Sequence, residues 1–160
     1  MQIFEDQDKL KKYRYVLTID KKIKLLASTE DDLDIISNLC QDAILSKEEF
    51  FFDKEKKIFV ATLSRYCWEK EGAKFNQDNT VYYRVVCGLQ IKNVIAINYK
   101  NYNNKWSFLN LLAITHKENK IFLHFSKSME IILKCKKISI LIEDIDIPWP
   151  TKLKPNHNVK

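Results

Sequence analysis

The sequence predicts an α+β domain: a mostly antiparallel, strongly curved sheet or barrel with one N-terminal amphipathic helix. Three observations lead to this fold class. Short apolar or alternating segments, typical of strands, are separated by charged turns along most of the chain. One segment alone shows strong helical periodicity. The length of 160 residues, 46% of them hydrophobic, suits a single globular domain.

We divide the chain into a loose polar arm over residues 1–12, a single domain over 13–147 and an extended tail over 148–160. After the arm come the apolar segments YRYVLTI and IKLLAS, and at least the second is predicted to be a strand. The tail contains all three prolines, which lack the N–H that a central strand donates. We expect the tail to lie on the surface, with Trp149 as its anchor.

The helix is predicted directly after the first strand. Ser28 or Thr29 is placed to cap it, and the carboxylates of residues 30–32 oppose the positive end of the helix dipole. Apolar residues then recur at three- and four-residue spacing: Leu33, Ile36, Leu39, Cys40, Ala43 and Ile44. This stripe predicts a helix that packs by one face and covers one face or one end of the sheet.

Strand-like segments follow the helix to the end of the domain. They are EFFF, KIFVATLSRYCWE, TVYYRVVCGLQI, NVIAINY, WSFLNLLAIT and KIFLHFS. The last stretch, SMEIILKCKKISILIEDIDI, is long enough for two short strands or one long bent strand. Charged or polar turns between these segments favour antiparallel neighbours.

Lysine dominates the basic residues, since only three of the twenty-seven are arginine. The net charge of +6 is spread along the chain, so we do not expect a nucleic-acid partner. The loop KNYNNKW keeps single-stranded RNA binding as an alternative, because it combines aromatic and basic side chains that stack on bases and contact phosphates.

Several chemistries are disfavoured by composition. Nucleotide-binding loops need glycines at fixed spacing, and the chain has only Gly72 and Gly88. His116, His124 and His157 lack the close partner spacing of a zinc site. The sequence therefore predicts no metal site and no cofactor.

The four cysteines are widely spaced and form no CxxC pair. The N-terminal MQIFEDQD is acidic and unlike a secretory signal, and no apolar run has the roughly eighteen residues of a membrane helix. We expect a cytoplasmic protein with no membrane contact. An enzyme with a cysteine nucleophile stays an alternative, although Cys67 shares strand parity with Phe59 and Leu63, which indicates packing.

Arg65 and Arg84 lie in consecutive strand-like segments and define the candidate ligand-binding residues together with Trp68, Asp42 and Asp144. A guanidinium offers a planar fork of donors that lysine does not have. If the strand register sets odd against even positions, the two arginines stand side by side. They then form either a structural ion pair with a carboxylate or a site for a carboxylate or phosphate ligand.

Several motifs together resemble a known family, domain of unknown function 2948, over about residues 23–157. They are Gln41-Asp42-Ala43 late in the helix, Arg65 and Trp68 at the end of one strand, and Arg84 with Gly88-Leu89 in the next. The runs ILIEDIDIPW and Pro155-Asn156-His157 extend the resemblance toward the C-terminus. Residues 126–128, Ser-Lys-Ser, depart from the glycine-rich turn expected there. The resemblance implies an alphaproteobacterial cytosolic origin and no assigned activity.

With no catalytic constellation in view, we expect a non-catalytic cytosolic module that binds a protein partner or a small anionic ligand. Its oligomeric state is left open by the sequence.

Overall fold

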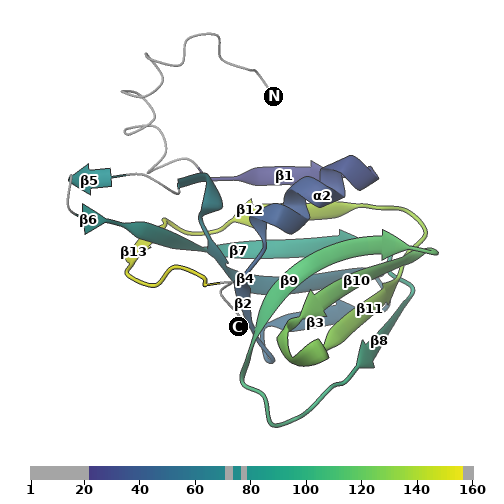
Figure 1. Cartoon of the computed structure of the whole chain (residues 1–160). Coiled ribbons are helices and arrows are strands. Elements are labelled where there is room, and N and C mark those ends of the chain that lie inside the picture. Colours follow the sequence, from purple (N-terminus) through teal and green to yellow (C-terminus); the bar gives the residue numbers. More distant parts are fainter. Residues whose placement is uncertain (1–21, 71–73, 77–78, 157–160) are drawn as a thin grey trace.

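A computed structural model describes residues 22–70, 74–76 and 79–156, with the side chains of residues 22–70 and 81–156 (Figure 1). The predicted arm over residues 1–12, the segment YRYVLTI and His157 lie outside the described residues.

The described residues form strands and one α-helix, with two short 3-10 turns. In chain order the elements are β1 (Lys24–Ala27), α2 (Glu30–Leu39), β2 (Ala43–Ser46), β3 (Phe50–Asp53), β4 (Ile58–Tyr66), η1 (Trp68–Lys70), β5 (Lys74–Asn76), β6 (Asn79–Thr80), β7 (Tyr82–Lys92), β8 (Ala96–Lys100), β9 (Phe108–Lys117), β10 (Lys120–Phe125), η2 (Ser126–Ser128), β11 (Glu130–Lys134), β12 (Ile140–Asp144) and β13 (Trp149–Thr151).

Eleven strands form one sheet whose main path runs β1-β12-β7-β4-β2-β9-β10-β11-β8. β3 pairs with β4, and β13 pairs with β7 beyond the end of β12. Every pairing is antiparallel, so the predicted antiparallel character is confirmed. A separate hairpin joins β5 to β6. The terminal stretch forms two strands, β11 and β12.

The prediction of a strongly curved sheet or barrel is wrong, because the sheet is open. Its end strands β1 and β8 do not pair with each other within the described part of the chain. The physical reason lies in the helix, which contacts both β1 and β9 (Figure 1). Helix packing, and not a further strand ladder, therefore spans that side of the molecule.

Strict alternation along the long strands separates an inner from an outer face. On β4 the residues Phe59, Ala61 and Leu63 are buried, and on β7 Val85, Cys87, Leu89 and Ile91 are buried. These odd-numbered residues pair across the two strands. All but Val85 join one core with residues of β9–β12, and Val85 packs in a smaller cluster with Cys67 and Tyr83. We call the face of β4 and β7 that carries the even-numbered residues the outer face.

Helix α2 begins where the sequence predicts. Thr29 is the N-cap, and its side chain and that of Asp32 form a capping box across the first turn. Leu33 and Ile36 are buried in the same core as β4 and β7. The Oγ of Ser37 accepts a hydrogen bond of 2.9 Å from the backbone N–H of Ile114 on β9. The helix is thereby fixed to the sheet by polar as well as apolar contacts.

The end of the predicted apolar stripe is strand and not helix. The helix ends at Leu39, and Ala43 and Ile44 begin β2. Asp42 between them has a φ of 62°, a left-handed conformation that breaks the helical path. The apolar residues therefore keep their helical spacing in the sequence, although the backbone leaves the helix before Ala43.

The predicted tail is strand in part. Trp149–Thr151 forms β13 beside β7, with Pro150 opposite Tyr83. Proline is tolerated because β13 is short and occupies one edge only. Trp149 is 38% exposed, so it is not a buried anchor.

The turn after β10 keeps a left-handed geometry without glycine. Lys127 and Ser128 have φ values of 61° and 57°. L-residues adopt this conformation at a cost of roughly 1–2 kcal/mol each. The missing glycines therefore leave strain in this turn.

We predict that Ser128→Gly raises the free energy of unfolding by about 1 kcal/mol relative to Ser128→Ala. Both variants remove the hydroxyl, but only glycine relieves the left-handed strain. Urea denaturation of the two variants measures the difference. Equal stability of the glycine and alanine variants would show that the turn is unstrained.

Candidate functional site

The predicted site residues fall into two groups on opposite faces of the sheet. Arg65 pairs with Val85 across β4 and β7, and Tyr66 pairs with Arg84. Even positions therefore meet even positions, and the two arginines do not stand side by side. Arg65 points inward with Asp144, whereas Arg84 lies on the outer face near Asp42 and Trp68.

Arg65 is completely buried and surrounded by acceptors. Its Nε and Nη2 donate to the carboxylate of Asp144 at 2.9–3.2 Å. Its Nη1 and Nη2 donate to the two carboxylate oxygens of Glu69, both at 2.9 Å. Nη1 also reaches the carbonyl of Tyr66 at 3.3 Å. All five N–H groups of the guanidinium thus have protein acceptors in reach.

The electrostatics of this group favour a permanent charge on Arg65. Burial alone lowers the pKa of the guanidinium, but the hydrogen bonds and charges of Glu69 and Asp144 outweigh it and raise the pKa. An anionic ligand at Arg65 would have to displace a carboxylate already bound there. The geometry is that of a structural ion pair.

Asp144 extends the group to the first strand. Its Oδ2 accepts a hydrogen bond of 2.9 Å from the backbone N–H of Ile23, and its own N–H donates to the carbonyl of Ile23 at 2.8 Å. One carboxylate therefore joins the start of β1, the end of β12 and the end of β4. We call Arg65, Glu69 and Asp144 the buried arginine cluster.

Arg84 is half-buried and contacts carbonyl oxygens. Its Nη1 donates to the carbonyl of Ser64 at 3.0 Å and lies 3.5 Å from that of Asp42. The guanidinium carbon lies 5.9 Å from the ring centre of Tyr66. Burial lowers the pKa of Arg84, and the charge of Asp42 opposes this effect.

Trp68, the first residue of η1, packs beside Tyr66 and Arg84. Its Nε1 donates a 2.9 Å hydrogen bond to the carbonyl of Gln41, and its ring meets Tyr66 edge-on with centroids 4.5 Å apart. The structure therefore brings Asp42, Trp68 and Arg84 together, as a group that joins the end of the helix to β4 and β7.

Sequence reasoning missed Glu69, the second carboxylate on Arg65. A signal was present, because Glu69 follows Arg65 by four residues within the same segment, KIFVATLSRYCWE. The segment reads as the end of a strand, however, where such spacing does not bring side chains together. The short turn η1 folds Glu69 back toward Arg65.

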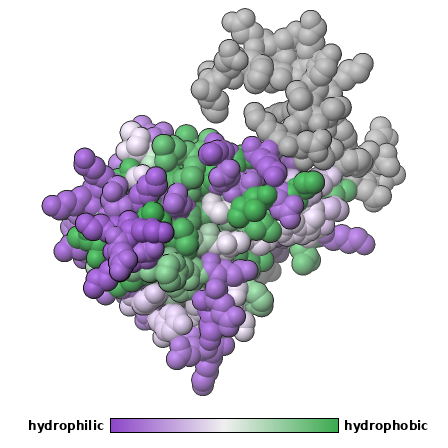
Figure 2. All heavy atoms as spheres, turned by 180° about the vertical axis from the view of Figure 1, so that it is seen from behind, coloured by the Kyte–Doolittle hydropathy of each residue, from purple (hydrophilic) through white to green (hydrophobic). Residues whose placement is uncertain are grey.

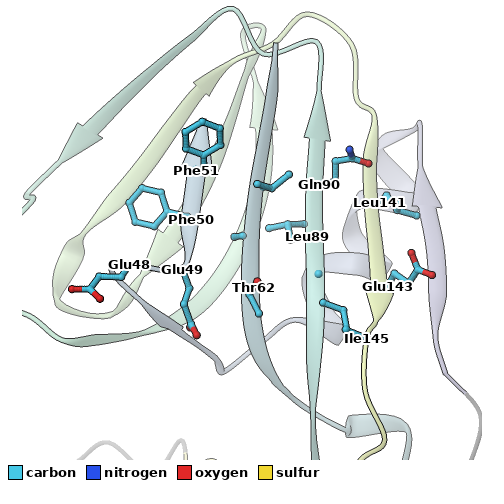
Figure 3. A pocket seen from close by; sticks show the side chains of 13 residues that line it. Glu48, Glu49, Phe50, Phe51, Thr62, Leu89, Gln90, Leu141, Glu143 and Ile145 are labelled. Carbon is cyan, nitrogen blue, oxygen red and sulfur yellow. The ribbon is translucent and has the colours of Figure 1, made fainter. Parts of the chain in front are cut away.

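An open groove lies on the outer face of β4 and β7 and extends to Glu143 and Ile145, the two neighbours of Asp144. It has a volume of about 590 Å³ and is formed by β3, β4, β7, β12 and the segments next to them (Figure 3). Its lining residues are Glu48, Glu49, Phe50, Phe51, Val60, Ala61, Thr62, Gly88, Leu89, Gln90, Leu141, Glu143 and Ile145. None of the predicted site residues lines it.

A row of side chains crosses five strands at this groove. Strand register sets Leu26 opposite Leu141, Leu141 opposite Gln90, Gln90 opposite Val60, and Val60 opposite Phe51. Paired residues lie on the same face. Leu26, Val60 and Phe51 are 67%, 37% and 62% exposed. We call these five residues the cross-strand row. Apolar patches bordered by polar side chains are visible on the surface in Figure 2.

A second row explains why the face is hollowed. Lys24 pairs with Glu143, Glu143 with Gly88, and Gly88 with Thr62. Gly88 contributes no side chain, and a Cβ there would lie in ordinary contact with the Ile145 side chain at 3.4 Å and the Glu143 carbonyl oxygen at 3.7 Å. The missing side chain therefore opens the floor of the groove.

The cysteines are all buried and free. Burial raises the pKa of the Cys67 and Cys87 thiols to about 12, and the same cause raises the pKa of Cys40 and Cys135. A thiol with a raised pKa is a poor nucleophile near neutral pH.

The aromatic residues of the KNYNNKW loop pack against one another and against Tyr99 just before it. The rings of Tyr99 and Tyr102 lie 5.4 Å apart, and Tyr102 meets Trp106 edge-on at 6.1 Å. Trp106 is buried. The described side chains contain no group of three or more His, Cys, Asp or Glu arranged to hold a metal ion.

The comparisons identify one family. Residues 23–157 match the family model described as protein of unknown function (DUF2948). No curated protein and no solved structure matches the chain. Across the described ranges, no helix has the length and apolar character needed to cross a membrane.

We predict that Arg65→Lys lowers the free energy of unfolding by about 3 kcal/mol, because it leaves buried carboxylates without the forked donor. Arg84→Lys is the matched control, and we expect about 1 kcal/mol for it because the hydrogen bonds it loses are to carbonyl oxygens, while lysine keeps the positive charge near Tyr66 and Asp42. Chemical denaturation measures both. Similar losses for the two variants would contradict the structural role of the buried arginine cluster.

We predict that the native protein reacts with a thiol reagent at pH 8 only as fast as it unfolds, because all four thiols are buried. Between pH values of about 9 and about 12 the unfolded thiols ionise while Cys67 and Cys87 stay protonated in the fold. Stability therefore falls as the pH rises through this window. A cysteine labelled rapidly in the native chain would overturn this prediction, with the urea-unfolded chain as the control.

Proposed function

The chain belongs to the family of proteins of unknown function DUF2948, and we propose that it acts as a non-catalytic module that binds a protein partner. The binding surface in this proposal is the outer face of β1, β12, β7, β4 and β3. The groove and the cross-strand row lie there together.

The observation that carries the proposal is the exposure of the cross-strand row. Leu26, Val60 and Phe51 present large apolar side chains to solvent on paired strands. Apolar side chains gathered on one face, here with the polar Gln90 between Leu141 and Val60, are characteristic of protein-interaction sites. Single exposed apolar residues occur on any protein, but a row fixed by the register of five strands is a continuous surface.

A protein partner has more support than the small anionic ligand of the sequence-based prediction. The charged side chains that line the groove are glutamates. Arg65 is buried against two carboxylates, and Arg84 donates to carbonyl oxygens and lies over the ring of Tyr66. An anion would meet like charge in the groove and an already occupied guanidinium at Arg65. The ligand-binding role of Arg65, Arg84, Trp68, Asp42 and Asp144 stays a prediction.

The two alternatives also stay predictions with less support. Single-stranded RNA needs open aromatic faces, but the rings of Tyr99, Tyr102 and Trp106 contact each other. A cysteine nucleophile needs an accessible thiolate, and the four thiols are buried with raised pKa values.

A cytoplasmic location and an alphaproteobacterial origin are further predictions that we retain. We also retain the amphipathic character of α2, which is supported by buried Leu33 and Ile36 beside exposed Asp31 and Asp34.

We predict that Phe51→Ser lowers the recovery of the bound partner at least about tenfold, a loss of about 1.4 kcal/mol. Phe108→Ser is the matched control, because Phe108 is 66% exposed against 62% for Phe51 and lies on β9, outside the groove. The measurement is quantitative affinity capture with the full chain and both variants. Neither variant removes a buried ring, so we expect unchanged melting temperatures. Retention of every partner by Phe51→Ser at the wild-type level would refute the proposal.

A further inference from the structure

The groove has a charge opposite to that of the protein as a whole. Its three charged lining residues are Glu48, Glu49 and Glu143, in a chain of net charge +6. Local charge of this kind steers and orients the partner that carries the opposite sign. The negative charge of the lining thus distinguishes basic from acidic protein partners.

The glutamates flank an apolar floor. Glu48 and Glu49 come just before β3 on one side, and Glu143 lies on β12 on the other side (Figure 3). Between them lie the apolar side chain of Val60 and the position of Gly88, and Leu141 lies next to Glu143 along β12. A segment bound here meets apolar surface at its centre and carboxylates at both borders.

These carboxylates are available to a partner. Among the described residues no ion pair involves Glu48 or Glu49. Glu143 lies 3.9 Å from the Nζ of Lys24, and the Glu143 side chain is 50% exposed. Exposed pairs of this kind contribute little, typically about 0–1 kcal/mol, so a partner cation can replace Lys24 at small cost.

Resting on the proposed function, we propose that the partner binds the groove with a segment that carries lysine or arginine next to large apolar side chains. The apolar side chains cover the cross-strand row and enter the hollow over Gly88. The cationic groups lie against Glu48 and Glu49 on one side and Glu143 on the other. An acidic segment would place like charges at both borders.

The test uses the isotopically labelled full chain and two defined peptides, Ac-KIKVKF-NH2 and Ac-EIEVEF-NH2. Nuclear magnetic resonance follows the backbone amides of Thr62, Gly88 and Glu143 during each titration. We expect the basic peptide to shift these signals and to bind at least about tenfold more tightly than the acidic peptide. Its affinity falls as salt rises, because the groove charges are exposed to solvent.

A matched pair of triple variants assigns the effect to the groove. Glu48→Gln, Glu49→Gln and Glu143→Gln together remove the acidic borders, and we expect them to abolish the preference for the basic peptide. Asp34→Asn, Glu55→Gln and Glu118→Gln remove the same net charge from exposed positions outside the groove, and we expect them to keep it.

Several results would overturn the inference. They are equal binding of both peptides, equal effects of the two triple variants, or no signal shift with either peptide at millimolar concentration. If the inference fails while Phe51→Ser still loses a captured partner, the proposed function stands and only the partner's charge class is wrong. If Phe51→Ser also keeps every partner, the proposed function fails as well. Self-association of the full chain through this face, seen as a dimer that the groove variants dissociate, would assign the surface to a second copy and contradict the inference.

Discussion

The buried ion pair between Arg65 and Asp144, completed by Glu69, holds the sheet together at the ends of its central strands. Arg65 comes from the end of β4, Asp144 from the end of β12, and Glu69 from the turn after β4. Two hydrogen bonds between Asp144 and the backbone of Ile23, one donated by each residue, add β1 to the same centre. Removing one partner of such a pair leaves a buried charge without compensation, at a cost of roughly 3–5 kcal/mol.

The outer surface depends on this centre through strand register. Odd-numbered residues of β4 and β7 point into the core, and Arg65 is the last of them on β4. The even-numbered residues are then set by the same register, which aligns Val60 with Gln90 and Thr62 with Gly88. A slip of one residue would turn the core residues outward and destroy both the arginine cluster and the cross-strand row. The groove is thus a consequence of the same pairing that buries Arg65.

Much of the local structure could be predicted from the sequence. Thr29 and the acidic first turn identify the start of the helix, and alternation identifies β4 and β7 with Arg65 on the inner face. Apolar spacing wrongly extended the predicted helix to Ala43 and Ile44. The three- and four-residue intervals continue past Asp42, and the pattern of apolar residues does not show that the backbone of Asp42 is left-handed. The open sheet was also not predictable, since strand order depends on contacts between distant segments.

The candidate site was less predictable than the fold. The pairing of Arg65 with Asp144 joins residues 79 positions apart, and only composition and position suggested it. The opposite faces of Arg65 and Arg84 depend on the register of β4 against β7. The groove combines Glu48 and Glu49 with Glu143, residues that are adjacent only after β3, β4, β7 and β12 have assembled. Pairwise strand registers are long-range properties, and alternation within a single strand carries no information about them.

Native-state amide hydrogen exchange of the full chain tests most directly whether the buried arginine cluster is the stabilising centre. The N–H of Ile23 donates to the carboxylate of Asp144 at 2.9 Å, and the N–H of Asp144 donates to the carbonyl of Ile23 at 2.8 Å. Both residues lie next to the end of the β1–β12 ladder, where amides would otherwise fray. We predict that both amides exchange only on global unfolding, as slowly as amides in the middle of β4 and β7. Exchange of Ile23 and Asp144 through local fraying, while the amides of β4 and β7 stay protected, would contradict it.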